Sequence, residues 1–518
     1  MKMQITKDNY YALIDIGSNT MRLVIYLPNE AGRFREIENV KAVARLRNHL
    51  TDEGYLSEEG ITILLETLEE FKDVLNIYPL KHFTVVATAT VRQAKNKDVL
   101  VQTVKDQLGW DMQILSEEEE AFYGYLAIVN STSLTEGVTV DMGGGSTEVT
   151  YFKDRKLIYA HSFPFGTLSL RQLYDDTLSE TDNLQTVKSY VKEAFRTLDW
   201  LEDLSVPIIA IGGSARNVAQ IDQIDKDYPM AGLHQYPMLL KDLNRIKDHL
   251  LSLSDKKRMK VEGLSKDRAD IILPAIMTFI TLYKYTHADR FVLSQKGLRD
   301  GINYELLFHK QEEPYSPNVL EDSFQELISD FDLDIRQVFQ VQHLTREIFE
   351  TLLDHKVKGL TKKDWTILRR ASYVFNMGDY IDNESSAQHT FYLLSNRTID
   401  GLSHRKKLEL ALVASFKNKT VFKQFVRPYK SWLTKTERKK MMLLGALLKF
   451  TYCLDATKRH AISDVSITVK KKTIKLTLTH TKNAAPEIYQ AEKQKKHLEK
   501  ALKRTIDLTF VKASKDKE

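Results

Sequence analysis

Cysteine is nearly absent from this chain, which has one, Cys453, among 518 residues. A single thiol cannot form a disulfide within the chain, and it excludes metal sites built from several cysteines, such as structural zinc centres. Long apolar runs are also lacking: the longest, Ile271 to Tyr283, falls well short of the ~20 residues that span a bilayer. We therefore predict a buried helix there, and no membrane association. The N-terminal segment lacks the apolar core of a secretory signal, so we expect a cytoplasmic protein.

Composition and charge are those of a soluble protein with several domains. Hydrophobic residues make up 42% and charged residues 28% of the chain, and at roughly 150 residues per domain its length suggests three or four domains. The net charge of +5 is unevenly spread, because residues 451–518 contain 16 Lys and Arg against 8 Asp and Glu, a net of +8 that leaves −3 for the rest. This basic end would attract a polyanion such as polyphosphate or nucleic acid, although a solvated basic face explains it equally well.

The first 130 residues alternate between predicted strands and helices. Two apolar runs, 13–15 and 22–26, flank a polar turn at 17–19, which predicts a β-hairpin. A helix is predicted after Ser57, a favourable N-cap that is followed by two glutamates and an apolar stripe. The other predicted elements are strands at 37–46, 83–87 and 112–115 and helices at 98–108 and from 117. The resulting βββαβαβα order indicates an α/β layered domain.

The start of this pattern recurs later in the chain. Residues 14–20, IDIGSNT, have a counterpart 126 residues further on in residues 140–146, VDMGGGS. In both segments an apolar strand leads through an Asp to a Gly-containing turn, and a second apolar strand follows, ending at Tyr26 and Phe152. A repeat on this scale predicts two similar domains that face one another.

The character of the sequence changes after about residue 310. Residues 311–317, with Pro314 and Pro317, are predicted to be a linker, and the sequence beyond is helical and charged to about residue 450. Alternating apolar residues on both sides of the basic turn Lys470 to Lys472 predict a hairpin, followed by a basic helix at 491–504 and a last strand. We therefore predict four parts, at 1–130, 131–310, 311–455 (helical) and 456–518 (a small basic α+β unit).

The glycine-rich segment from Asp141 to Glu148 is the strongest local signal of function. Gly143, Gly144 and Gly145 allow the backbone to approach an anion closely, and the hydroxyls of Ser146 and Thr147 add donors, which suits phosphate oxygens. Carboxylates at both ends would repel phosphate unless a hard cation such as Mg²⁺ lies between them, so Asp141 and Glu148 are candidate metal ligands. A plain glycine turn between strands is the alternative, and the loop alone does not separate a phosphatase from a kinase.

Two further segments resemble this loop in chemistry. Ser18, Asn19 and Thr20 would supply neutral donors to phosphate, with Asp15 as a metal ligand or water-positioning group, unless the segment is only a tight turn. A third segment, with Gly212, Gly213 and Ser214, follows a predicted strand and opens a helix, so its amides would face an anion at a helix N-terminus. This signal is weaker, because two glycines after a strand are common.

Arg92 and Glu120 carry the predicted chemistry of cleavage. Arg92 follows a buried strand, at the sheet edge where ligands bind, and its guanidinium could clamp a phosphate; a surface salt bridge is equally compatible with the sequence. Ser116 and Glu119 form a predicted capping box at the start of a helix, which explains most of the acidic run at 117–120. The capping box does not account for Glu120, a candidate general base for an attacking water.

Five segments in this order resemble the exopolyphosphatase/guanosine pentaphosphate phosphatase (Ppx/GppA) family. They are 14–20 (IDIGSNT), 87–92 (ATATVR), 115–121 (LSEEEEA), 140–148 (VDMGGGSTE) and 211–215 (IGGSA), within a resemblance that covers about residues 10–305. The resemblance implies two duplicated actin-like, ribonuclease H-like domains. It also implies Mg²⁺-dependent removal of a terminal phosphate from polyphosphate, or of the 5′ γ-phosphate from guanosine pentaphosphate.

The same resemblance assigns roles to single residues. It makes Glu120 the catalytic glutamate, Arg92 a phosphate-binding arginine, and Asp141 and Glu148 the essential acidic pair. Two positions depart from the family pattern: Glu117 replaces a glycine, and Gln295, in the segment 294–301 (SQKGLRDG), replaces an acid.

Long members of this family continue into a helical region similar to HD phosphohydrolases. Where such a region would carry its paired His and acid, this chain has Phe375 and Asn376, so we expect no second metal centre there. His343 and His389 are isolated, and we interpret them as structural because metal sites need several convergent ligands.

The sequence thus predicts an exopolyphosphatase that requires Mg²⁺ or another divalent cation. The basic C-terminal part would give a long polyanion a second point of attachment, which favours polyphosphate over guanosine pentaphosphate as the partner. The alternatives are a guanosine pentaphosphate phosphohydrolase, a kinase of the same fold and a nucleotide-sensing regulator. We expect a homodimer, no membrane partner and no nucleic-acid partner, although the basic C-terminal part also permits nucleic-acid binding.

Overall fold

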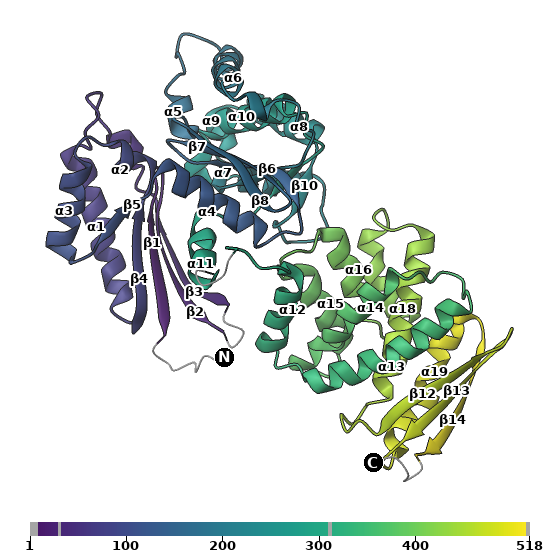
Figure 1. Cartoon of the computed structure of the whole chain (residues 1–518). Coiled ribbons are helices and arrows are strands. Elements are labelled where there is room, and N and C mark those ends of the chain that lie inside the picture. The colour runs from purple at the N-terminus through teal and green to yellow at the C-terminus, as the bar shows by residue number, and fades with distance from the viewer. Residues whose placement is uncertain (1–8, 30–32, 309–312, 514–518) are drawn as a thin grey trace. The chain divides into compact units, whose positions relative to one another are not determined.

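The computed structural model of the chain describes residues 9–29, 33–308 and 313–513. It divides into two compact units, residues 1–228 with 233–319, and residues 229–232 with 320–518 (Figure 1). The predictions for the N-terminal segment before residue 9 and for the first residues of the linker, 311 and 312, lie outside the described residues.

The first sheet of the larger unit has the strand order β3-β2-β1-β4-β5. The predicted hairpin is confirmed, because β1 pairs antiparallel with β2 and the turn joins Ile16 to Met21. β4 and β5 continue the sheet in parallel, and Ser57 caps the first helix as predicted. The strands are β1 (Tyr10–Ile16), β2 (Met21–Pro28), β3 (Phe34–Ala42), β4 (Leu80–Ala87) and β5 (Met112–Ile114), with helices α1 (Glu58–Leu75), α2 (Ala89–Gln93) and α3 (Lys97–Leu108).

The second sheet repeats this topology and confirms the predicted duplication. Its strand order β8-β7-β6-β9-β11 matches β3-β2-β1-β4-β5 position by position, and β10 adds an antiparallel edge strand. The strands are β6 (Glu136–Met142), β7 (Thr147–Lys153), β8 (Lys156–Phe163), β9 (Ile208–Ile211), β10 (Tyr236–Met238) and β11 (Phe291–Leu293). The helices are α5 (Thr167–Arg171), α6 (Glu180–Arg196), α7 (Gly213–Asp225), α8 (Leu240–Leu251), α9 (Asp255–Arg258) and α10 (Ile272–Tyr285), of which α10 is the buried apolar helix predicted from the sequence.

Two helices, α4 (Glu117–Val129) and α11 (Leu298–Phe308), fill the space between the two sheets (Figure 1). Their buried side chains form one core with residues from both sheets, among them Leu13, Val86 and Phe152. The helices approach so closely that a Cβ added to Gly301 would lie 2.0 Å from the Tyr123 carbonyl oxygen. The sequence places α4 at the end of the first domain, but the helix packs against β7 and β8 of the second.

The smaller unit combines a helical bundle with a three-stranded sheet. The bundle helices are α12 (Val319–Asp330), α13 (Ile335–Asp354), α14 (Asp364–Tyr373), α15 (Ser386–Asn396), α16 (His404–Ala414), α17 (Lys419–Val426) and α18 (Lys435–Cys453). The predicted hairpin forms β12 (Ile462–Val469) and β13 (Thr473–His480), and β14 (Thr505–Lys512) pairs in parallel with β13. The basic helix, α19 (Ala485–Leu502), begins six residues before its predicted start, because Pro486 is suited to a first helical turn.

Phe375 and Asn376 have structural roles in this bundle. The ring of Phe375 is buried and packs against Tyr452, with 4.9 Å between the ring centroids. Asn376 adopts a left-handed conformation, with φ of 56°, which starts a short 3-10 turn at Met377–Tyr380. Phe375 therefore contributes to the packing of the bundle, and Asn376 changes the direction of the chain.

The contact between α4 and α11 leads to a stability prediction. Gly301→Ala should lower the free energy of unfolding by about 1–3 kcal/mol, because its methyl group has no space beside the Tyr123 backbone. Gly124→Ala, in α4, is the matched control, because its Cβ would lie 3.7 Å from Ile211, an ordinary contact. Chemical denaturation of both variants measures the effect, and equal stabilities would contradict the packing described here.

Candidate functional site

The carboxyl ends of the central strands of both sheets converge on one pocket of about 320 Å³. β1, β4, β6 and β9 all end here, where open α/β sheets bind their ligands. The predicted site residues on the pocket wall are Asp15, Ser18, Asn19, Thr20, Glu120, Asp141, Gly143, Gly144, Ser146, Glu148, Gly212 and Gly213. Segments more than 200 residues apart in the sequence thus meet, as the duplication predicts.

The two repeated turns are closed by the equivalent backbone hydrogen bond and lie in contact. In the first turn the Gly17 amide donates to the Thr20 carbonyl, and in the second the Gly143 amide donates to the Ser146 carbonyl at 3.0 Å. A Cβ added to Gly144 would lie 3.1 Å from the Cβ of Ser18, and one added to Gly145 would lie 3.0 Å from its hydroxyl. The glycines therefore allow the two turns to pack closely, in addition to leaving their backbone open to an anion.

Several polar groups beside these turns are buried without hydrogen bonds. Among the described residues, the Ser18 hydroxyl, both side-chain amide atoms of Asn19 and the Thr90 hydroxyl have no partner. A buried polar group without a partner costs about 1–3 kcal/mol. These groups are therefore suited to a polar ligand that supplies the missing bonds, and phosphate oxygens match the donors among them.

Four carboxyl groups, of Asp15, Glu120, Asp141 and Glu148, lie on one side of the pocket. Burial and repulsion from Glu148 raise the pKa of Glu120 to about 8, against the attraction of Arg92. Burial and repulsion from neighbouring carboxylates likewise raise the pKa of Asp141 and that of Glu148 to about 7. Burial also raises the pKa of Asp15. Such a group of desolvated carboxyls is suited to a bound cation or to proton transfer near neutral pH.

The predicted metal ligands Asp15, Asp141 and Glu148 do not form a closed cage. No group of three or more His, Cys, Asp or Glu side chains converges closely enough to hold a metal ion anywhere in the described part of the chain. Asp15 instead pairs with Arg299 at 3.2 Å, and Glu148 accepts a hydrogen bond from Ser162 at 2.9 Å. Mg²⁺ binds through one or two carboxylates together with water and substrate phosphates. The desolvated carboxyls of Asp141 and Glu148 fit such an open site.

Arg92 and Glu120 are brought together, although Arg92 lies outside the pocket wall. Its guanidinium donates to Glu120 and to the Leu115 carbonyl oxygen, both at 2.9 Å. The predicted capping box of Ser116 and Glu119 is present at the start of α4 and directs Glu120 toward the pocket. The Nε and Nη2 atoms of Arg92 are buried and have no hydrogen-bond partner among the described residues, and Nε lies 4.0 Å from a carboxylate oxygen of Glu117.

Three other predicted phosphate-binding residues do not line the pocket, and two of them make hydrogen bonds within the protein. Gly145, Thr147 and Ser214 lie outside the pocket wall, and the Thr147 hydroxyl donates to the Phe165 carbonyl oxygen at 2.7 Å. Ser214 accepts a bond from Arg268, whose guanidinium also covers Gly213, since a Cβ there would lie 2.3 Å from it. The N-terminus of α7 therefore lies beside the Arg268 guanidinium, which lines the same pocket.

The sequence motifs gave no role to five cations on the pocket wall. These are Arg22, Lys41, Arg216, Arg268 and Arg299. Asp15, Arg22 and Lys41 are neighbours across β1, β2 and β3, so a predicted register of the hairpin could have placed the first two together. Burial and neighbouring cations lower the pKa values of the Arg22 and Arg216 guanidinium groups, and a polyanion in the pocket would offset this repulsion.

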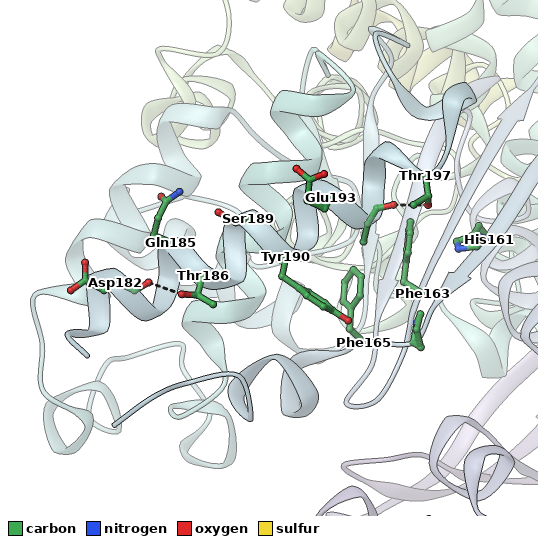
Figure 2. Close-up of a pocket in the computed structure, with 12 residues that line it drawn as sticks. His161, Phe163, Phe165, Asp182, Gln185, Thr186, Ser189, Tyr190, Glu193 and Thr197 are labelled. Atoms are coloured by element: carbon green, nitrogen blue, oxygen red, sulfur yellow. Dashed lines mark hydrogen bonds between the residues drawn. The ribbon is translucent and has the colours of Figure 1, made fainter. Parts of the chain in front are cut away.

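A larger hollow, of about 920 Å³, lies between α6 and β8 (Figure 2). Phe163 and Phe165 line it from the strand side, Tyr190 of α6 packs edge-on against Phe165, and Asp182 and Glu193 of α6 also line it. The residues that line it include no glycine turn and no lysine or arginine. The smaller pocket is therefore the better candidate for phosphate chemistry.

We call each of the two sheets, together with its helices, a lobe. Two duplicated α/β lobes with a pocket suited to phosphate between them define the actin-like class of fold. The family model described as "Ppx/GppA phosphatase family" matches residues 25–310, and the model "Ppx/GppA phosphatase, domain III" matches residues 319–499. The chain therefore belongs to the Ppx/GppA phosphatase family, as the sequence motifs predicted.

Individual proteins show the same likeness. A guanosine-5′-triphosphate,3′-diphosphate pyrophosphatase of Pseudoalteromonas translucida is 26% identical over 413 residues, which is 78% of this chain and 80% of that protein. An exopolyphosphatase structure from Cytophaga hutchinsonii has a TM-score of 0.53 at 22% identity, covering 59% of this chain and all of that one. The Aquifex aeolicus family member has a TM-score of 0.51 at 23% identity, covering 59% of this chain and 99% of that one. The two structures share the fold with this chain.

No helix within residues 9–29, 33–308 and 313–513 combines the length and the apolar character that crossing a bilayer requires.

The raised carboxyl pKa values predict a pH dependence of stability. A carboxyl whose pKa is higher in the folded state binds more protons when folded, so its contribution is present at low pH and is lost as pH rises through the folded pKa. Thermal unfolding in chelator should show stability falling between pH 5.5 and 8.5, partly because Asp141 and Glu148 ionise near pH 7.

In Glu148→Gln, the free energy of unfolding should fall by about 1–3 kcal/mol less over this pH range than in the wild type. Glu118→Gln, at an exposed position of α4, should show the wild-type decrease. Parallel slopes for the wild type and Glu148→Gln would contradict the description of the buried carboxyl group.

Proposed function

We propose that this chain hydrolyses phosphoanhydride bonds in the pocket between its two lobes, releasing terminal orthophosphate from inorganic polyphosphate. The observation that carries the proposal is the placement of Glu120 on the wall of a pocket whose other groups are suited to phosphate. A carboxylate with a pKa near neutrality, held by a buried arginine, has the properties of a general base for water.

In this mechanism the turn residues bind and orient the terminal phosphate. The Ser18 hydroxyl and the Asn19 amide, which make no hydrogen bonds with the described residues, would donate to its oxygens, together with the backbone of Gly143 and Gly144. Such fixed donors stabilise the charge on the transferring phosphoryl group. Arg92 would hold Glu120 in the orientation needed to take the proton of the attacking water.

Asp141 and Glu148 would hold Mg²⁺ or another divalent cation. When bound, the cation would reduce repulsion between the carboxylates and the substrate and polarise its phosphate oxygens. The neighbouring Ser162 hydroxyl would keep the Glu148 carboxylate in place.

The substrate is expected to be a polyanion. Five cations on the pocket wall exceed what a single phosphate needs, and residues 451–518 add a net charge of +8. Each of these cationic regions would attract a long polyanion more strongly than a small one.

Guanosine pentaphosphate is the second candidate substrate. It is favoured by the name of the Pseudoalteromonas translucida relative, which covers 78% of this chain, and by the same cation-rich wall. The two candidates share the chemistry at Glu120 and differ in what occupies the pocket beyond the terminal phosphates.

Replacement of Glu120 tests the proposed chemistry. Glu120→Gln should lower kcat for phosphate release by about 10²- to 10⁴-fold, because the amide keeps a hydrogen bond to Arg92 but takes no proton from water. Binding of polyphosphate should change little. Glu118→Gln is the control at an exposed position of the same helix. Activity of Glu120→Gln within threefold of the wild type would exclude Glu120 as the base.

Parallel assays test the substrate. Phosphate release should be measured from long-chain polyphosphate and from guanosine pentaphosphate, each with Mg²⁺ and with chelator. The proposal predicts Mg²⁺-dependent release, with a higher kcat/KM for polyphosphate. A higher value for guanosine pentaphosphate would assign the chain to the second candidate function, and no release from either substrate would contradict both.

A further inference from the structure

Arg299 occupies a defined position at the junction of the two lobes. It is the second residue of α11, its side chain is one-quarter exposed, and it lies on the pocket wall. The close contact of Gly301 with the Tyr123 backbone fixes the start of α11 against α4, the helix that carries Glu120. The Tyr123 hydroxyl also donates to Glu305 at 2.8 Å. Arg299 and Glu120 are therefore presented by two helices whose relative position is fixed by packing.

The guanidinium of Arg299 has more donors than it uses. Its bond to Asp15, at 3.2 Å, is the one hydrogen bond or ion pair that it makes with the described residues. A guanidinium carries five N–H donors in a rigid fork. The remaining donors border the pocket, where a ligand can reach them.

Charges on both sides of the pocket act on Arg299. Its attraction opposes the burial that raises the pKa values of Asp15 and Asp141, and its repulsion adds to the burial that lowers those of Arg22 and Arg216. Arg299 therefore stands where the carboxyl side of the pocket meets the cationic side. An anion bound at this boundary would face Glu120 and contact the guanidinium.

The other arginines near the carboxyl groups make different contacts. Arg92 lies behind Glu120, outside the pocket wall, and one of its nitrogens is used by Glu120 and Leu115. Arg268 covers the N-terminus of α7. Arg299 is thus the wall guanidinium that is paired with a carboxylate of the site and still has donors open to the pocket.

We propose that Arg299 is a catalytic residue that binds non-bridging oxygens of the terminal phosphoryl group, while its ion pair with Asp15 sets its orientation. This inference rests on the proposed function. The water oxygen forms a bond to the terminal phosphorus as the bond from that phosphorus to the bridging oxygen breaks. The water proton passes to Glu120, and the electron pair of the broken bond remains on the shortened chain.

Arg299 neither gains nor loses a proton in this step. Two N–H donors of a planar guanidinium match two phosphate oxygens, and they offset charge on the phosphoryl group as it is transferred. Asp15 then acts as a positioning residue for Arg299, which differs from the metal-binding role that the sequence suggested.

The test compares Arg299→Ala and Arg299→Lys in the full chain. For polyphosphate, kcat should fall by about 10³-fold or more in Arg299→Ala, the range seen for arginines that act on a transferring phosphoryl group. Arg299→Lys should recover only part of this loss, because an ammonium cannot make the forked contact. Arg290→Ala, at an exposed ion pair just before β11, is the matched control and should retain wild-type activity.

Chemical rescue separates a catalytic role from a structural one. Guanidinium ion, at concentrations that leave the wild type folded, should restore the hydrolytic activity of Arg299→Ala in a saturable way. Ammonium ion at the same ionic strength should not restore it. Asp15→Asn combined with Arg299→Ala should not recover activity. Recovery in that double variant would overturn the proposal, because it would mean that Arg299 only neutralises Asp15. Activity of Arg299→Ala within threefold of the wild type would also overturn it.

A binding measurement keeps this test distinct from the proposed function. Orthovanadate, a phosphate analogue, should raise the Tm of the wild type and of Arg290→Ala and should have a much smaller effect on Arg299→Ala. If neither polyphosphate nor guanosine pentaphosphate is hydrolysed, the proposed function fails, and the vanadate shift still decides whether Arg299 binds a phosphoryl group. An equal shift in wild type and Arg299→Ala, or none in the wild type, would contradict the assignment.

Discussion

Mutual repulsion among four largely desolvated carboxyl groups is the constraint on which the rest of the site depends. Asp15, Glu120, Asp141 and Glu148 come from four different elements, and their removal from water raises the pKa of each. Arg92 and Arg299 oppose this repulsion through ion pairs with Glu120 and Asp15. Packing holds α4, α11 and the central strands in place despite this repulsion. A bound cation would balance the carboxylates, and a bound polyanion would balance the cationic side chains.

Duplication explains how the chain builds such a site from simple parts. Each lobe contributes a strand, a tight turn and a second strand, and the turns meet because the two sheets present the same strand ends to one pocket. Glycine is required at this meeting point for space, since Gly144 and Gly145 lie against Ser18. The two turns then differ in chemistry. In the first, side-chain atoms of Ser18 and Asn19 have no hydrogen-bond partner in the described part of the chain, and the second is flanked by Asp141 and Glu148.

Local sequence signals predicted the parts of the fold that depend on local physics. The capping box at Ser116 and Glu119, the N-cap at Ser57 and both hairpins are set by neighbouring residues and are confirmed. Tertiary contacts decided the rest. Arg268 reaches Gly213 across the fold, the Thr147 hydroxyl turns to Phe165, and α11 brings Arg299 to Asp15, none of which a local pattern specifies. Glu120 and Arg92 were candidates for the cleavage chemistry from the sequence and the family resemblance. Their ion pair with one another could be found only in the structure.

In the mechanism we propose, water attacks the terminal phosphorus in this pocket. Polyphosphate hydrolysis in ¹⁸O-labelled water, with the released phosphate analysed by mass, follows the oxygen atom of that water. Each orthophosphate removed from a chain end should carry one ¹⁸O atom, and the remaining chain should shorten by one unit at a time. Unlabelled orthophosphate would mean that water attacks the penultimate phosphorus and that the label stays on the shortened chain, and release of larger fragments would place the cleavage away from the chain end; either result would exclude this mechanism.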